Sequence, residues 1–202
     1  MPDIEAQVAA SAGDCDYNPG PETWSAERGS IVLCRNEGVG NRGGAGFRFP
    51  AVAIPQGATI TSARLSFHND GSAHILDTAR AYISAELADN AAVFSTQGDF
   101  DTRRTNVTSK VDWTIAQWID GNAWYDSPSV VAPVQSIINR AGWVTGNALV
   151  MFVEDFDGRS SALAVRSAVA YDDTPSQAAK LYATYTVGAA RGSSILVAAE
   201  VI

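Results

Sequence analysis

Basic residues are scarce in this sequence. Its 202 residues include 14 Lys and Arg against 22 Asp and Glu, which gives a formal net charge of -8 at pH 7 and a pI near 4.6. An acidic surface repels both nucleic acid and anionic membranes. We therefore expect neither among the partners, and we expect the charge to keep the molecule soluble.

Long apolar runs are also missing. No stretch approaches the roughly 18 apolar residues that a membrane span needs. The opening sequence MPDIEAQVAASAGD lacks the positive region and the apolar core of a signal peptide, so the cleavage-like triplet Ala10-Ser11-Ala12 has no segment to present it. We expect the chain to fold in the cytoplasm without an export signal.

Cysteine is limited to Cys15 and Cys34. A disulfide between them would close a loop of about 20 residues and contribute about 3 kcal/mol in the chain-entropy model. Cytoplasmic folding opposes its formation. The sequence favours two buried thiols, and a disulfide formed after release into an oxidising medium is the alternative.

Catalytic motifs are absent. The sequence has no G-x-S-x-G, no H-E-x-x-H and no P-loop, and its two histidines, His68 and His74, share one segment. With Asp70 and Asp77 nearby, these histidines could ligate a metal, but a polar loop is the simpler interpretation. No pair of carboxylates is singled out for glycoside cleavage. We expect no enzyme, no catalytic residue and no cofactor.

Three acidic segments have the alternating spacing of oxygen ligands: Asp14-x-Asp16-x-Asn18, Asp99-x-Asp101 and Asp155-x-Asp157. The first begins like a calcium loop, but Pro19 and Ser25 stand where that loop needs glycine and a bidentate glutamate. We expect solvated turn residues or caps, with a structural calcium ion as the alternative.

A glycine-rich stretch follows the expected strand Ile31–Cys34. Gly38, Gly40 and Gly43 spell G-x-G-x-x-G, but a nucleotide site also needs a helix directly afterwards. The chain continues instead into the alternating residues Phe47-Arg48-Phe49. A glycine-rich hairpin is therefore the prediction.

The stretch FRFPAVAIPQGATITSARLSF, residues 47–67, predicts two strands joined by a corner. Pro50 and Pro55 interrupt the ladder, and Gln56-Gly57 forms the turn. Ala63, Leu65 and Phe67 then alternate with polar residues, as in a half-buried strand.

Further elements follow from the same patterns. Strands are predicted at 79–85, 148–153, 163–170 and 181–187, and in the last one Leu181, Ala183, Tyr185 and Val187 face inward. One helix is expected from a cap at Ser129 to an end at Gly142, with Pro133 in its first turn and Ala141 on its apolar stripe. Residues 88–104 are read as a long connection.

Trp113, Trp118, Trp124 and Tyr125 lie within 13 residues of each other. Exposed indoles would form a sugar-stacking platform, whereas buried ones would close one edge of the core. Burial is the favoured interpretation.

The order of these segments carries a resemblance. Residues 47–67, the block VDWTIAQWIDGNAWYDSPSVVAPVQSIINRAGWVTGNALVMFVED and the closing AAKLYATYTV resemble jelly-roll β-sandwich domains, over roughly residues 8 to 187. Such domains occur as carbohydrate-binding-like modules in exported bacterial proteins and in uncharacterised tailed-phage virion proteins. The resemblance implies an all-β, antiparallel jelly-roll-type β-sandwich with one short α-helix. We divide the chain into an N-terminal arm (1–13), the sandwich domain (14–187) and a C-terminal arm (188–202).

The resemblance also implies a function. The first expectation is a structural virion protein of a tailed bacteriophage, either a capsid decoration (cement) protein or a tail accessory protein. Its partners would be other virion subunits, as a homo-oligomer on a capsid or tail, and release by lysis would explain the missing export signal. The alternative is a carbohydrate-binding or adhesion module that recognises a surface glycan.

The C-terminal arm ends in ILVAAEVI, which is apolar on both faces of an extended chain. Such a strand is an aggregation hazard unless something covers it. It would either add one more strand to its own sandwich or pair with a neighbouring subunit. The expected interface residues are Ile195, Leu196, Val197, Val201 and Ile202.

Overall fold

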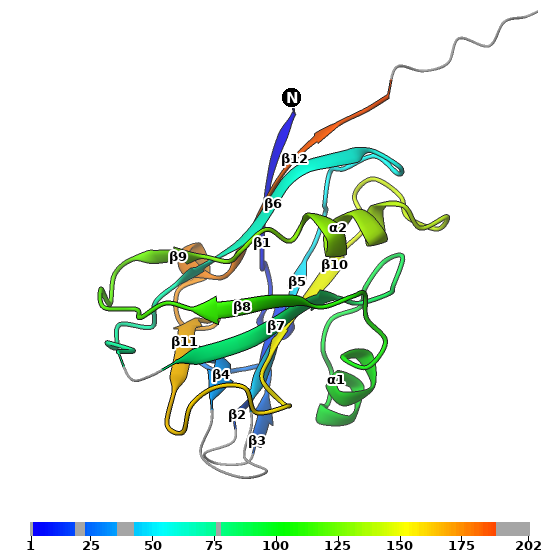
Figure 1. Ribbon diagram of the computed structural model, residues 1–202. Helices are drawn as coiled ribbons and strands as arrows, with labels where there is room; N and C mark the ends of the chain where they lie inside the picture. The colour runs from blue at the N-terminus through cyan, green and yellow to red at the C-terminus, as the bar shows by residue number, and fades with distance from the viewer. Residues whose placement is uncertain (1, 19–22, 36–42, 76–77, 189–202) are drawn as a thin grey trace, which may run out of the picture.

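The computed structural model describes residues 2–18, 23–35, 43–75 and 78–188 (Figure 1). This part of the chain is mostly β-structure, and every strand pairing in it is antiparallel. The strands are β1 (Asp3–Gln7), β2 (Asp14–Asn18), β3 (Thr23–Ser25), β4 (Ser30–Arg35), β5 (Gly44–Phe49), β6 (Thr59–His68), β7 (Ala79–Ala85), β8 (Val111–Ile115), β9 (Trp124–Asp126), β10 (Leu149–Glu154), β11 (Val165–Val169) and β12 (Lys180–Thr186). The helices are α1 (Gln97–Arg103) and α2 (Val131–Ile138), with short 3-10 turns at Ser11–Gly13 and Pro175–Gln177.

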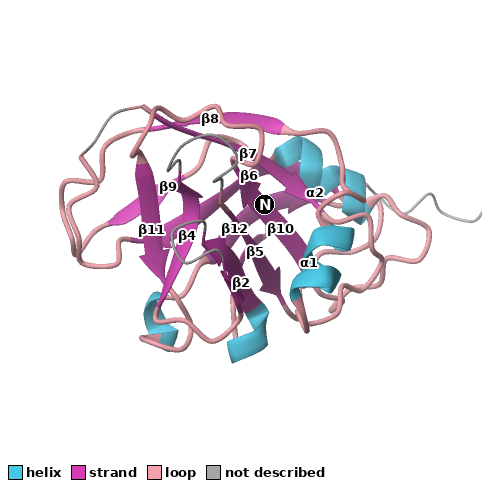
Figure 2. Cartoon of the chain, turned by 90° about the horizontal axis from the view of Figure 1, so that it is seen from below, coloured by secondary structure: helices cyan, strands magenta, loops and turns pink. Residues whose placement is uncertain are grey.

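The strands form three sheets that share one core. Their orders are β3-β2-β5-β10-β7-β8, β1-β12-β6-β9 and β11-β4. The rings of Phe47 on β5 and Phe67 on β6 lie 5.2 Å apart, and Phe67 stacks on Trp113 of β8 at 5.9 Å. Because β5 and β8 belong to the six-stranded sheet and β6 to the four-stranded sheet, these contacts join the two layers. Figure 2 shows α1 and α2 together at one side of the strands.

The segment 47–67 has the predicted form. It contributes β5 and β6, and Gly57 adopts the left-handed backbone of a turn, with φ of +71°. Phe47, Phe49 and Leu65 are fully buried. The alternation of apolar and polar residues therefore identified the inner side of both strands.

Strand β10 is buried on both faces, and residues 148–153 are accordingly all apolar. It lies between β5 and β7 in the six-stranded sheet. In β12, Leu181 and Ala183 face the core as predicted. The inward placement of Val187 is wrong, because the strand ends at Thr186 and Val187 is 57% exposed.

Helix α2 lies within the predicted range but is shorter. Val130 is its N-cap residue, with no side-chain cap, so the predicted cap at Ser129 is wrong. The helix ends at Ile138 with Asn139 as its C-cap, and Ala141 is exposed beyond it. Val130, Val134, Ile137 and Ile138 are buried, and the helix packs against β6 and β7.

The structure has a second helix, so the expectation of one helix is wrong. Residues 88–104, predicted to be a connection, contain α1, which begins where Thr96 Oγ1 accepts the backbone N–H of Asp99 at 3.1 Å. Phe94 and Phe100 flank this start and pack on Phe152, on the outer side of the six-stranded sheet. The segment therefore covers a second apolar cluster, centred on these three rings.

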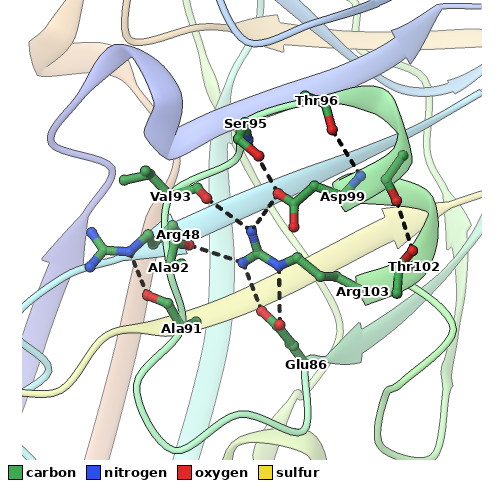
Figure 3. A network of polar contacts seen from close by, with 11 residues as sticks. Arg48, Glu86, Ala91, Ala92, Val93, Ser95, Thr96, Asp99, Thr102 and Arg103 are labelled. Atoms are coloured by element: carbon green, nitrogen blue, oxygen red, sulfur yellow. Dashed lines mark hydrogen bonds and ion pairs between the residues drawn. The ribbon is translucent and has the colours of Figure 1, made fainter.

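Arg103 fixes this segment in place (Figure 3). Its guanidinium binds both carboxylate oxygens of Glu86, at 3.0 and 2.8 Å, and Asp99 at 3.2 Å. It also donates to the carbonyls of Ala92 and Val93. Bidentate pairing of this kind fixes orientation as well as position.

The first residues belong to the four-stranded sheet. Within the segment 1–13, Asp3–Gln7 pairs along its whole length with β12 as strand β1. None of the described helices has the length and apolar content needed to cross a membrane.

Candidate functional site

The four-stranded sheet turns one side to solvent, and we call this side the outer face. Strand alternation places Leu181 and Ala183 inward, so Lys180 and Tyr182 point outward. The register then puts neighbours from three other strands beside them. The outer face is defined by Glu5, Arg64, Trp124, Asp126, Lys180 and Tyr182.

These side chains contact one another across the strands. Glu5, Tyr182 and Arg64 form one row over β1, β12 and β6, with the Arg64 guanidinium 4.5 Å from the centre of the Tyr182 ring. Arg64 Nε also binds Asp126 Oδ2 at 2.9 Å. Arg64 therefore has both a carboxylate and an aromatic neighbour. Lys180, the other cation of the outer face, has neighbours of the same two kinds.

Lys180 connects the two ends of the outer face. Its Nζ lies 2.8 Å from Glu5 Oε1 and 5.1 Å from the centre of the Trp124 ring. The hydrogen bond with Glu5 raises the pKa of Lys180, and the hydrogen bond from Lys180 lowers the pKa of Glu5. Partial burial raises the pKa of Tyr182, so its hydroxyl stays protonated at neutral pH.

A shallow hollow of about 190 Å³ opens beside this row. Arg64 and Tyr182 form part of its wall, and hydroxyl groups come from Ser62 and Thr184. Ring faces, hydroxyls and paired charges suit the binding of a polar partner that also offers apolar surface. This arrangement has no nucleophile paired with a base.

The tryptophan cluster is mostly buried, as predicted. Trp113 and Trp118 are 7% and 1% exposed, and Trp118 stacks on Tyr125 at 4.8 Å. Trp124 differs, because 39% of it is exposed on the outer face. The row of exposed indoles that would form a sugar platform is therefore reduced to one ring.

Both histidines are buried, although the segment between them is the predicted loop and its tip, Gly71 to Ala73, is exposed. His68 ends β6 and meets the Trp124 ring edge-on at 5.2 Å. His74 Nε2 lies 2.9 Å from Asp70 Oδ1 and packs against Trp118. Burial raises the pKa of Asp70, but the hydrogen bonds with His74 and Ser72 outweigh it and hold this pKa below its ordinary value.

The acidic pairs have three different roles. Asp99 belongs to the start of α1, and Asp155 accepts the N–H groups of Arg159 and Ser160, so these two are caps and turn residues as predicted. Asp14 and Asp16 are instead fully buried in β2, and the expectation of solvated turn residues is wrong for them. Within the described ranges, no three or more His, Cys, Asp or Glu side chains come together to hold a metal ion.

The cysteines are free and buried, in two different clusters. Burial raises the pKa of Cys34 to about 12 and that of Cys15 well above its ordinary value, so both stay thiols. Of the G-x-G-x-x-G residues, only Gly43 is described, and β5 follows it directly. Gly38 and Gly40 lie outside the described residues.

Sequence reasoning overlooked Trp24. It lines a second hollow of about 330 Å³ together with Phe94, Glu27 and the hydroxyl-bearing residues Ser11, Ser25 and Ser95. A lone tryptophan in a three-residue strand gives no periodic signal, so only the fold reveals this position.

The predicted interface residues Ile195, Leu196, Val197, Val201 and Ile202 lie outside the described residues. A comparison with protein-family models finds no match for this chain, and a search of curated proteins finds no similar sequence.

Proposed function

We propose that this chain is a non-catalytic structural protein of a tailed-bacteriophage particle, a capsid decoration protein or a tail accessory protein. Its resemblance to virion domains and its layered, mostly β architecture support the proposal. The observation that carries it is the pre-ordered outer face, on which Arg64 and Lys180 are each held by a carboxylate and an aromatic ring.

Pre-ordering matters because association must offset the entropy lost when side chains become fixed. Immobilising a flexible side chain costs about 0.5–1.5 kcal/mol. On the outer face, Arg64 and Lys180 are already restrained before any partner arrives. Tyr, Trp and Arg are also the residue types that dominate binding energy at protein interfaces. The outer face is therefore suited to contact a neighbouring subunit in a repeating assembly.

We infer a jelly-roll-type connection of the strands. Neighbours that are distant in sequence support it: β12 lies between β1 and β6, and β10 lies between β5 and β7. A return of late strands to lie beside early ones is typical of Greek-key and jelly-roll sandwiches. In this account the C-terminal arm, residues 188–202, supplies a second contact by pairing with a neighbouring subunit.

Co-sedimentation tests the proposal. Phage particles purified from the lysate that contains this protein, and stripped of it, are mixed with the wild type, with Arg64→Glu and with a chain that ends at residue 188. We expect the wild type to bind, and each change to weaken binding by roughly tenfold or more, because reversing a central charge or removing an anchor costs over 1 kcal/mol.

Arg80→Glu is the matched control, because Arg80 is an exposed arginine of the six-stranded sheet. It should bind within about twofold of the wild type, as expected for a residue away from the interface. The proposal is wrong if the wild type does not bind. The role of the outer face is wrong if Arg64→Glu and Arg80→Glu behave alike.

A glycan-binding or adhesion module is the second candidate, favoured by the exposed ring of Trp124 next to the polar side chains of the outer face. Calorimetry against the host's surface polysaccharides checks it. We expect Trp124→Ala to abolish binding and Trp24→Ala to leave it unchanged, because stacking on one ring would supply much of the affinity. Equal binding by both variants, or none by the wild type, excludes this candidate.

A further inference from the structure

Two buried carboxylates connect separate sheets of the molecule. Asp14 and Asp16 lie two residues apart on β2, so both point to the same, inner side, and both are fully buried. Asp16 Oδ2 accepts the backbone N–H of Val32 in β4 at 2.9 Å. Asp14 Oδ2 accepts the backbone N–H of Tyr171, two residues after β11, at 3.0 Å. These bonds tie the six-stranded sheet to the β4–β11 sheet.

The two carboxylates differ in what compensates their charge. Asp16 Oδ1 lies 2.8 Å from Arg28 Nε, which gives it a cation. Asp14 Oδ1 has no hydrogen-bond partner among the described residues. The charged groups that act on Asp14 are both acidic: Asp16 on its own strand, and Asp172 from the segment after β11.

The segment 171–173 is held by few bonds besides the one to Asp14. Ser11 Oγ donates to Asp172 Oδ2 at 2.9 Å, and the N–H of Asp173 donates back to the carbonyl of Ala170 at 3.3 Å. Asp172 and Asp173 are exposed. Local opening of this segment would let water reach Asp14 without unfolding the sheets.

We propose that protonation of Asp14 controls whether the segment 171–173 stays closed against the rest of the protein. We call the bond between Asp14 and the Tyr171 N–H the clasp. The neutral carboxyl holds the Tyr171 N–H inside the protein. The ionised carboxylate, buried without a cation and next to other acidic groups, loosens the segment because solvation relieves the uncompensated charge.

The sign of the effect follows from the pKa in the two states. Burial raises the pKa of Asp14 to about 7, and the carboxyl regains its ordinary value of 3.8 when the segment opens. The closed state therefore binds the proton more tightly. The free energy by which this proton favours the closed state is complete below about pH 4 and is lost as the pH rises to about 7. Between pH 5 and pH 8 the opening equilibrium should grow by about two orders of magnitude.

Asp16 belongs to the same inner surface but is the weaker switch. Burial raises its pKa to about 6, while the Val32 N–H and Arg28 hold the shift below that of Asp14. By the same linkage, opening around Asp16 should grow by only about one order of magnitude between pH 5 and pH 8, because its closed state has mostly released the proton above about pH 6.

Amide hydrogen exchange, followed by NMR, tests the clasp. Exchange of the Tyr171 amide is measured at pH 5 and pH 8 and divided by the intrinsic chemical rate at each pH. In the wild type we expect the corrected rate to rise by roughly 100-fold. In Asp14→Asn, which keeps the shape and an acceptor oxygen but cannot ionise, we expect it to be nearly independent of pH.

Asp126→Asn is the matched control, because Asp126 is half exposed and paired with Arg64. It should show the same rise as the wild type. The proposal is overturned if the wild-type rate does not rise, or if Asp14→Asn shows the same rise. Should Asp14→Asn fail to fold, the Tyr171 and Val32 amides of the wild type decide: the clasp requires a rise at Tyr171 that is clearly larger than the roughly tenfold rise expected at Val32.

Discussion

At the scale of single residues, close packing leaves some positions with no room for even one added atom. Gly46 in β5 lies under the ring of Phe94, on the outer side of the six-stranded sheet. A Cβ at this position would lie 2.9 Å from Phe94 Cε1 and 3.1 Å from Phe152 Cε1. Glycine is needed here for space, because Phe94 must approach the strand closely.

We expect Gly46→Ala to lower the free energy of unfolding by about 2–4 kcal/mol, because the methyl group would force the Phe94 ring off the sheet. Urea denaturation measures the change. Gly98→Ala is the control, because the nearest atom to its Cβ is Thr96 Oγ1 at 3.9 Å, and a helical alanine should be neutral or stabilising.

The loss should shrink in a Phe94→Ala background, where the methyl group has space. If Gly46→Ala is as destabilising there as in the wild type, steric overlap with Phe94 is not the reason for the glycine.

Residue patterns of period two were sufficient for much of the fold. Ala79, Ala81 and Ile83 are all fully buried on β7, as their alternation predicts. His68 and His74 show the limit of such reasoning. Their neighbours in sequence are polar, and only contacts with Trp124 and Trp118, about 44 to 56 positions away, bury them.

At the scale of elements, α1 was not predicted because its sequence shows almost no helical pattern of apolar residues. Only Phe100 of its seven residues is buried, so no apolar stripe with helical period exists. Its capping sequence, Thr96 followed three residues later by Asp99, was the available clue. The tertiary bonds of Arg103 to Glu86 then fix a helix that is too short to be stable alone.

Strand β2 was not predicted because its sequence pattern fits both a loop and a strand. Aspartate is a poor strand former, so Asp14-x-Asp16 suggested a loop, although alternation is also the strand period. The contacts that hold the strand are long-range: the N–H groups of Val32 and Tyr171 each donate to one oxygen of the two carboxylates. No pattern within residues 14–18 reveals those partners.

At the scale of the whole molecule, the outer face exists only because four strands meet. Glu5, Arg64, Trp124 and Lys180 are spread over most of the chain and come from β1, β6, β9 and β12. Sequence predicted which residues of β6 and β12 point outward. It could not give the register that brings Tyr182 over Arg64 and Lys180 over Trp124. The candidate site was therefore beyond sequence reasoning, although parts of its strands were not.

Charge also acts at this scale. The chain has a formal net charge of -8, yet both cations of the outer face are neutralised locally by Glu5 and Asp126. Copies of the molecule would repel each other through most of their surface, and a locally neutral face offers the approach with the least repulsion. This distribution of charge supports the proposal that ordered contacts form through the outer face.

The most direct test of the proposed virion role is hydroxyl-radical footprinting of the protein alone and after mixing with purified phage particles. Trp124 and Tyr182 report on the outer face, and Trp24, partly exposed in the other large sheet, is the internal control. If the outer face is the contact, oxidation of Trp124 and Tyr182 should fall by roughly tenfold in the particle while that of Trp24 is unchanged, because a protein interface excludes water from its centre. Equal oxidation of Trp124 and Tyr182 in the free and bound protein would contradict this contact.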